Sequence, residues 1–410
     1  MNKKLILNLT LIMLLLLIGC SSTAQADPQA SPPDVVTETE AEMDETTTQD
    51  IPQALPQAFS PDVVAEIQAE MDDLTTGGLP PGMIVWIDAP ENRFEGASGS
   101  ANLSDDIPMP PEGAFRIGSI TKMFTATVIV QLAEDGVLTL DDPLALWLPE
   151  VAAQLPYGDQ ITLRHLLTHT SGLFNVVEHE AYWADLFTEM VVDEEAGTVT
   201  LPCVQRDPHD TLTRYVYGKD ANFEPGAQWY YSNTNYTLLG MVIEAATEMP
   251  LAEAYRTHIY EPLGMASTFL DCYEEPLIDV VHGYSGIGDA MNDVTELHES
   301  VGWSAGGIVS TASDLIAFAR GLFGGALFDD PASLVAMTTP TPGSSYGLGI
   351  TLQKEYMGHA GYIAGFRSVL NYAPELDTVV VMVYNHDSAD PEQSLADVLN
   401  PVLPLLRVED

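Results

Sequence analysis

The chain has 410 residues, 46% of them hydrophobic, so it is long enough to bury a sizeable core. Its 60 Asp and Glu residues outnumber its 14 Lys and Arg residues, which gives a formal net charge of −46 at pH 7. A surface this negative repels nucleic acid and anionic lipid headgroups, and we exclude both as partners of the folded part.

The N-terminus predicts an export signal. Two lysines precede an apolar run over residues 5–18, which Gly19 and Cys20 end. The run is too short for a membrane-spanning helix, so residues 1–19 are expected to be a signal peptide. The four residues up to Cys20 resemble a bacterial lipoprotein box, which implies that Cys20 is acylated and anchors the chain to the bacterial cell envelope. An ordinary signal peptide with a chance cysteine is the alternative.

A disordered acidic tether is expected over residues 20–58, which are rich in Thr, Glu, Asp, Pro, Gln and Ala. The tether holds one copy of a near-repeat whose second copy begins at Ser60. Only the second copy keeps Val63, Ile67 and Leu74 on one helical stripe. The folded domain is therefore expected to span residues 59–410.

The first elements of this domain place a serine beside a lysine. Residues 83–87 and 94–103 predict paired strands, and a short strand before Gly118 leads into a helix. In the first turn of that helix, Ser119 and Lys122 are three residues apart and share a face. A serine becomes a nucleophile beside a base, and a lysine becomes a base when burial or another cation lowers its pKa. A chance pairing of the two residues is the alternative.

The remaining elements predict the fold class. The middle of the chain, about residues 136–300, is expected to form a helical subdomain, and a final helix is expected over about residues 388–406. Strands at both ends with helices between them predict an α/β (α+β) fold, with a mostly antiparallel sheet flanked by helices and a cleft beside the helical subdomain. The later strands are expected at residues 347–351, 356–363, 367–372 and 378–384.

Two short patterns downstream occur once each. They are the Y-x-N of Tyr231-Ser232-Asn233 and the H-x-G of His359-Ala360-Gly361. The order S-x-x-K, Y-x-N, H-x-G resembles the serine β-lactamase and penicillin-binding protein superfamily, whose motifs line one cleft. Residues 161–173, 223–226 and 302–307 also resemble family signatures. The resemblance covers roughly residues 60–405 and implies a β-lactamase/transpeptidase-like fold. Tyrosine in the second motif resembles the class C β-lactamase, D-Ala-D-Ala carboxypeptidase and esterase branch.

The resemblance implies a serine hydrolase that works through an acyl-enzyme. Ser119 would attack a carbonyl, and either Lys122 or Tyr231 would accept its proton. The sequence does not decide between these two bases, which could titrate as one coupled unit.

The same resemblance implies the substrate-binding residues. Asn233 would contact Lys122 and a substrate amide, and His359 would bind a substrate carboxylate or tune Tyr231. The backbone N–H of Tyr362, which follows Gly361, would complete an oxyanion hole with that of the nucleophile.

A D-alanyl-D-alanine carboxypeptidase-like activity on a small-molecule or peptidoglycan-peptide substrate is expected. His359 stands where many β-lactamases have a lysine with a permanent positive charge, which argues against efficient penicillin hydrolysis. An esterase or β-lactamase of the same superfamily is one alternative, and a non-catalytic penicillin-binding or sensor lipoprotein is another. We expect no cofactor.

A second serine pattern belongs to another enzyme class. Residues 302–306 around Ser304 match G-x-S-x-G, the nucleophile elbow of α/β-hydrolases. That motif needs an apolar strand before the serine and a helix that begins at it. Polar residues 298–300 precede Ser304 and two glycines follow it, so the context disfavours this assignment.

Cysteine and histidine complete the candidate residues. Cys203 and Cys272 are the two cysteines after Cys20, and an even number in an oxidising compartment favours a disulfide over two separate thiols. His165 and His169 are four residues apart, as in some zinc sites, but Leu166 stands where the H-E-x-x-H motif has glutamate. We expect a structural role for both histidines and no metal site.

Overall fold

The computed structural model describes residues 57–400, except residues 194–195, 288–289 and 299. The predicted signal peptide, the predicted lipidation site Cys20 and nearly all of the predicted tether lie outside the described residues. The last two tether residues, Gln57–Ala58, form strand β1. No helix in the described part of the chain has the length and apolar character needed to cross a bilayer.

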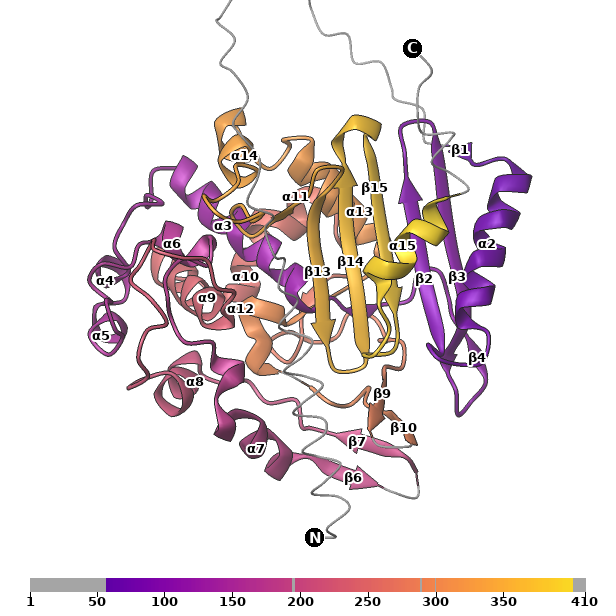
Figure 1. Cartoon of the computed structure of the whole chain (residues 1–410), viewed down its shortest axis with the longest axis horizontal. Helices are drawn as coiled ribbons and strands as arrows, with labels where there is room; N and C mark the ends of the chain where they lie inside the picture. The colour runs from indigo at the N-terminus through magenta and orange to yellow at the C-terminus, as the bar shows by residue number, and fades with distance from the viewer. Residues whose placement is uncertain (1–56, 194–195, 288–289, 299, 401–410) are drawn as a thin grey trace, which may run out of the picture.

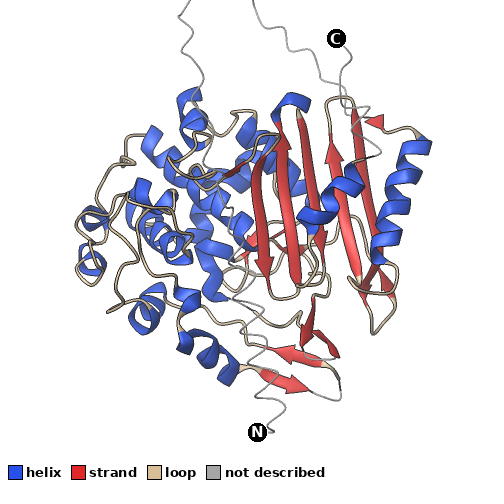
Figure 2. Cartoon of the chain, in the orientation of Figure 1, coloured by secondary structure: helices blue, strands red, loops and turns tan. Residues whose placement is uncertain are grey.

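One large sheet organises the molecule (Figures 1 and 2). All of its neighbouring pairs are antiparallel except β1 and β3, which run parallel. The predicted fold class, a mostly antiparallel sheet flanked by helices, is confirmed. In spatial order the strands are β1, β3 (Asn92–Asn102), β2 (Gly82–Asp88), β15 (Thr378–Tyr384), β14 (Phe366–Ala373), β13 (Met357–Ile363) and β12 (Thr351–Leu352), and β4 (Ile107–Pro108) pairs with β3.

Helices cover both faces of this sheet. On one face, α2 (Pro61–Thr75) and α15 (Pro391–Leu399) bury apolar side chains against β2, β14 and β15 (Figure 1). Helix α2 buries Ile67 and Met71 fully, whereas Val63 and Leu74 are only partly buried. On the other face, α13 (Ala312–Phe323) lies against the sheet and connects it to the helical layer.

The helical layer contains most of the middle of the chain. Its helices are α3 (Thr121–Glu134), α4 (Leu144–Trp147), α5 (Pro149–Ala152), α6 (Leu163–Leu167), α7 (Glu180–Glu189), α8 (Pro208–Tyr215), α9 (Asn233–Thr247), α10 (Leu251–Tyr255), α11 (Glu261–Leu263), α12 (Trp303–Gly306) and α14 (Pro331–Met337). Short strands that the sequence did not predict also occur here. They are β6 (Val191–Asp193), β7 (Thr198–Thr200), β8 (Phe269–Leu270), β9 (Tyr284–Ile287), β10 (Ala290–Asp293) and β11 (Ile308–Ser310).

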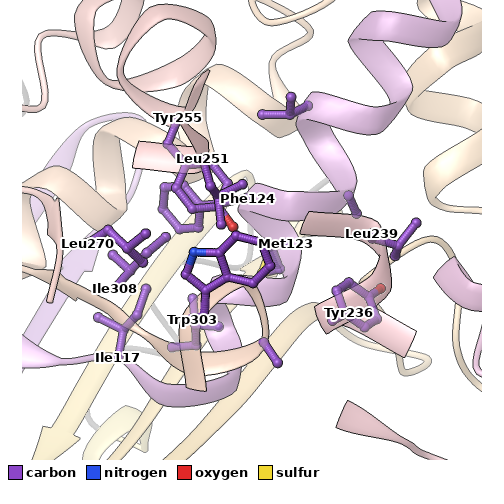
Figure 3. Close-up of a cluster of buried hydrophobic side chains, with 14 of the residues drawn as sticks. Ile117, Met123, Phe124, Tyr236, Leu239, Leu251, Tyr255, Leu270, Trp303 and Ile308 are labelled. Carbon is purple, nitrogen blue, oxygen red and sulfur yellow. The ribbon is translucent and has the colours of Figure 1, made fainter. Parts of the chain in front are cut away.

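Helix α3 is the centre of the core. Every residue from Thr121 to Val130 is buried, because α9, α10, α12 and α14 surround the helix. Phe124 stacks on Phe318 of α13 with ring centroids 3.7 Å apart, and Figure 3 shows Met123 and Phe124 among aliphatic and aromatic side chains of several elements. A helix held on all sides gives the residues at its N-terminus a fixed position.

Two predicted boundaries are wrong. Residues 347–350 do not form a strand, since Gly349 has a φ of +74° and β12 begins only at Thr351. The last helix, α15, begins at Pro391 rather than at about residue 388. Residues 401–406 of the predicted helix lie outside the described residues.

Candidate active site

The segment that carries Ser119 turns sharply from a strand into a helix. Strand β5 (Phe115–Arg116) pairs with β11, and a 3-10 turn over Gly118–Ile120 leads directly into α3. Gly118 has a φ of +52°, and a Cβ at this position would lie 2.7 Å from the backbone nitrogen of Tyr362. Glycine therefore permits both the turn and the close approach of β13. Ser119 is only partly buried, although both of its neighbours are buried.

Lys122 is fully buried and lies beside Ser119. Its Nζ donates to Ser119 Oγ at 3.0 Å, to Asn233 Oδ1 at 2.8 Å and to the carbonyl oxygen of Ala305 at 2.6 Å. Burying an ammonium group is costly unless hydrogen bonds replace water, and these three acceptors replace it. They also aim the amine at the serine hydroxyl.

The Y-x-N motif brings Tyr231 and Asn233 to the same place. Asn233 is the first residue of α9, and Asn175 Oδ1 accepts hydrogen bonds from its backbone N–H at 3.0 Å and its side-chain amide at 3.4 Å. These contacts fix the amide so that its oxygen faces Lys122. The Tyr231 ring centroid lies 4.9 Å from Lys122 Nζ, and the tyrosine is partly exposed.

Two further tyrosines lie behind Tyr231. Burial raises the pKa of Tyr236 and of Tyr346 well above the usual value, so both phenols keep their protons. Tyr236 Oη donates to the carbonyl oxygen of Leu167 at 2.9 Å. Unlike Tyr231, both are fully enclosed, so they support the site from within.

His359 is placed deeper than the sequence predicted. It is 6% exposed, and its ring centroid lies 6.4 Å from that of Tyr231. Its Nε2 lies 3.0 Å from Tyr346 Oη and its Nδ1 lies 2.6 Å from the carbonyl oxygen of Ala360. Burial, together with the nearby Lys122, lowers the pKa of His359 to about 3. The imidazole is therefore neutral at physiological pH.

The H-x-G glycine lets β13 lie against the segment that carries Ser119. A Cβ at Gly361 would lie 2.0 Å from the carbonyl oxygen of Ile117, a distance that no side chain permits. Ser368 of β14 donates to the same oxygen at 3.1 Å. The backbone nitrogen of Tyr362 consequently faces the turn at Gly118, beside Ser119.

Several residues of the site escaped sequence analysis. The carbonyl of Ala305 and the amide of Asn175 bind Lys122 and Asn233 directly, but neither belongs to one of the three motifs. Asn175 follows the stretch 161–173 by two residues, so its position gave a weak signal. A backbone carbonyl gives no sequence signal at all, since any residue supplies one.

The rival serine lies inside the fold. Ser304 is fully buried in α12, and its Oγ donates to the carbonyl oxygen of Tyr236 at 2.8 Å.

His165 caps α6 through a reciprocal pair of hydrogen bonds with Thr162. His169 lies beyond the end of that helix with a φ of +57°, so the two histidines do not share a helical face.

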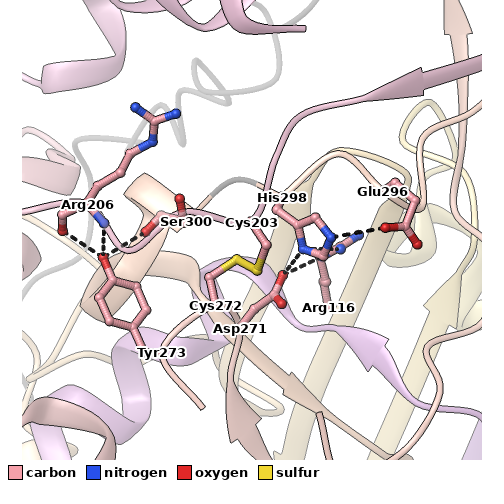
Figure 4. The surroundings of a disulfide bond; sticks show 9 residues. All are labelled: Arg116, Cys203, Arg206, Asp271, Cys272, Tyr273, Glu296, His298 and Ser300. Atoms are coloured by element: carbon pink, nitrogen blue, oxygen red, sulfur yellow. Dashed lines mark hydrogen bonds and ion pairs between the residues drawn. A yellow bond between two sulfur atoms is a disulfide. The ribbon is translucent and has the colours of Figure 1, made fainter. Parts of the chain in front are cut away.

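The two cysteines are joined near strand β5, beside the Arg116–Asp271 ion pair. Cys203 and Cys272 form a disulfide with a Cα–Cα distance of 5.3 Å (Figure 4). Beside it, Arg116 Nε donates to Asp271 Oδ2 at 3.0 Å, and His298 Nδ1 lies 3.1 Å from the same oxygen. Burial raises the pKa of Asp271, but the His298 and Arg116 contacts outweigh this effect and hold it below the usual range.

Comparison with known proteins decides the family. The sequence profile of the Beta-lactamase family matches residues 67–400. The chain belongs to the beta-lactamase family. Penicillin-binding protein 4* of Bacillus subtilis (strain 168) is 27% identical over 333 residues, which cover 76% of this chain and 69% of that protein. A D-aminopeptidase of Gluconobacter oxydans (strain 621H) is 30% identical over 319 residues, 71% of this chain and 53% of that protein.

Solved structures agree with this family assignment. A D-stereospecific amidohydrolase from a Streptomyces species has a TM-score of 0.68 and 30% identity, with 81% of this chain and 97% of that one covered. D-amino acid amidase from Ochrobactrum anthropi SV3 has a TM-score of 0.70 and 27% identity, with 84% and 100% covered. This member of the beta-lactamase family is accordingly a serine hydrolase.

Proposed function

We propose that this chain is an exported serine hydrolase that forms an acyl-enzyme on Ser119 and has D-alanyl-D-alanine carboxypeptidase-like activity. The observation that carries the proposal is the position of Lys122 Nζ, within 3.0 Å of Ser119 Oγ and 2.8 Å of Asn233 Oδ1. Asn233 is 111 residues from the lysine in sequence. A fold that brings these groups together around one amine supports a built catalytic site rather than a chance pattern.

The proposed reaction begins when Ser119 Oγ attacks the carbonyl carbon of an amide or ester. Lys122 or Tyr231 accepts the hydroxyl proton and delivers it to the leaving amine or alcohol. The backbone N–H groups of Ser119 and Tyr362 stabilise the oxyanion that forms, a contribution of about 3 kcal/mol per donor in related sites. Water then attacks the acyl carbonyl, and its proton returns through the same base to Ser119.

The choice of base rests on exposure and contacts. Lys122 contacts Ser119 directly, whereas Tyr231 is the partly exposed phenol that a leaving group can reach. Lys122 Nζ lies 4.9 Å from the Tyr231 ring centroid, so a change of charge on either group is felt by the other.

A second candidate is a D-amino acid amidase or D-aminopeptidase activity. Carboxypeptidase substrates end in a carboxylate, but His359 is neutral and both of its ring nitrogens already contact protein groups. A D-amino acid amide carries no carboxylate at that end. The D-aminopeptidase and D-amino acid amidase relatives favour this candidate. Esterase EstB of Burkholderia gladioli is 34% identical over 174 residues, which supports ester substrates as well.

Export and lipid anchoring are part of the proposal. The apolar run over residues 5–18 and the lipoprotein-like sequence at Cys20 support it. Labelling with a fatty-acid analogue during expression is expected to tag the wild type and to leave Cys20→Ala unlabelled. Equal labelling of both proteins would remove the lipid anchor from the proposal.

The nucleophile is tested by intact-protein mass spectrometry with an activated phosphonate probe. The wild type is expected to gain one adduct, which Ser119→Ala abolishes. Ser304→Ala is the matched control, because Ser304 is the other serine of a recognised motif and donates only to a backbone carbonyl. An adduct that survives in Ser119→Ala and disappears in Ser304→Ala would overturn the assignment.

The substrate class is tested by a turnover screen. We expect hydrolysis of a D-Ala-D-Ala peptide and of D-amino acid amides, and slow turnover of nitrocefin. A D-amide rate well above the D-Ala-D-Ala rate would select the second candidate. Covalent labelling of Ser119 without turnover of any substrate would instead favour a penicillin-binding or sensor role.

A further inference from the structure

His169 occupies an unusual place directly behind the candidate base. It is fully buried, and its backbone has a φ of +57° just beyond the end of α6. Its ring centroid lies 4.3 Å from that of Tyr231, 4.9 Å from that of Tyr346 and 5.2 Å from that of Tyr236. The imidazole therefore packs against the inner side of the Tyr231 ring.

The hydrogen bonds of His169 fix its tautomer. The backbone N–H of Ser232 donates to His169 Nδ1 at 3.2 Å, and the Asn235 side-chain amide lies 3.0 Å from the same nitrogen. Ser171 Oγ donates to Asn235 Oδ1 at 2.6 Å, so the amide nitrogen is the end that faces His169. Since Nδ1 accepts from two donors, it carries no hydrogen, and Nε2 carries it instead.

The second nitrogen of this ring has no conventional partner. Nε2 of His169 is buried and contacts no hydrogen-bond acceptor among the described residues. Its neighbours are aromatic rings, whose faces are weak acceptors. A buried N–H without a strong acceptor is unfavourable for stability, so a role in the site explains its presence better than a role in the core.

We propose that His169 is a positioning residue for Tyr231, a proposal that rests on the catalytic role given to Tyr231 above. Ser232 lies between Tyr231 and Asn233, and its N–H is the group that His169 holds. The imidazole thus fixes the backbone between the two motif residues while its ring supports the phenol.

The charge state of His169 fits this task. Burial, with added contributions from Lys122 and His359, lowers the pKa of His169 well below its usual value. A neutral ring supports the phenol without placing a second cation next to the Lys122 ammonium. The role needs an acceptor at Nδ1 and a flat ring, and histidine supplies both.

The test is a double-mutant cycle that combines His169→Ala with Tyr231→Phe. The rate at which the phosphonate probe labels Ser119 is followed for hours, and kcat and KM are measured with a p-nitrophenyl ester. His169→Ala is expected to lower the labelling rate and kcat by about 10- to 100-fold, the range for misplaced catalytic groups, with KM within about twofold. His169→Asn should recover part of the loss, because asparagine tolerates a positive φ and offers an acceptor oxygen to Ser232. In a Tyr231→Phe background, His169→Ala is expected to change the rate by less than about twofold.

His165→Ala is the matched control. His165 lies four residues earlier and caps α6, so its loss should lower the melting temperature. It should change the labelling rate by the same factor whether residue 231 is tyrosine or phenylalanine. Equal effects of His169→Ala with and without the Tyr231 hydroxyl would overturn the proposal, as would a change confined to KM. A Tyr231→Phe variant that labels as fast as wild type would overturn it together with the catalytic role of Tyr231. The nucleophile assignment would then still stand on Ser119→Ala.

Discussion

Two buried cations, Arg116 and Lys122, are each three residues from Ser119 in the sequence and are held in opposite ways. Arg116 is 2% exposed and donates to the carboxylate of Asp271. Lys122 is fully buried, and the three acceptors described above are a hydroxyl, an amide and a carbonyl, all of them uncharged. Arg116 is paired with a carboxylate, whereas the three acceptors named for Lys122 carry no charge.

The contrast predicts a structural role for Arg116 and a reactive role for Lys122. A carboxylate partner cancels most of the field of a guanidinium, so Arg116 contributes to folding rather than to chemistry. Neutral acceptors orient an ammonium without cancelling its charge, so Lys122 keeps its influence on Ser119 and Tyr231. We therefore expect loss of the lysine to appear in the rate, and loss of the arginine pair to appear in the stability.

Replacing Lys122 should give the largest effect on activity. Lys122→Gln removes the charge but leaves an amide that can still bond Asn233, and we expect kcat/KM for a p-nitrophenyl ester to fall by about 100- to 10,000-fold. Steady-state kinetics on the folded variant measures this loss. Arg116→Met is the control for removing a buried cation near Ser119. If kcat/KM, corrected for the folded fraction, falls as far in Arg116→Met as in Lys122→Gln, the two cations do not have the different roles described here.

Breaking the Arg116–Asp271 pair should give the largest loss of stability. Both side chains are almost fully buried, so Asp271→Asn leaves a guanidinium without its counter-charge. The expected cost in the free energy of unfolding is about 3–5 kcal/mol, measured by urea denaturation. The double variant Arg116→Met, Asp271→Leu should recover much of it. If Asp271→Asn unfolds at the same urea concentration as wild type, the pair is not the structural anchor described here.

The sequence predicted the local features of the site better than the distant ones. Ser119 and Lys122 are three residues apart on one helix, and such spacing is visible in sequence. The position of Asn175 and the Ala305 carbonyl depends on how α9 and α12 pack around α3, which no local pattern encodes. The burial of His359 depends likewise on the packing of Tyr346 against β13.

The same division holds for the fold. Strands β2, β14 and β15 have seven or eight residues each, and their predictions are confirmed within one residue at each end. The short strands β6 to β11 were missed because they lie among turns and have between two and four residues each. The region before β12 was assigned as a strand from its apolar residues, although Gly349 turns the chain there.

The smallest expected effect is a pH dependence of stability from His359. Its pKa is about 3 in the folded chain and about 6.5 when unfolded, so between these values only the unfolded chain binds the proton. Stability from this residue is complete above pH 6.5 and is lost as the pH falls, by up to about 1.4 kcal/mol per pH unit. Between pH 7.5 and 4.5, wild type should lose about 2–3 kcal/mol more than His359→Gln in urea titrations. If the free energy of unfolding changes equally with pH in the two proteins, His359 is not a buried histidine that stays neutral in the folded chain.

The disulfide has a topological consequence for the catalytic motifs. Cys203 and Cys272 are 69 residues apart, and the covalent ring they close contains Tyr231, Asn233 and all of α8, α9 and α10. A protease cut inside this ring does not release a fragment, because the sulfur bridge still joins its two sides. A nicked molecule would thus retain both halves of the active site on one covalent framework, and a thiol reductant would be needed to separate them.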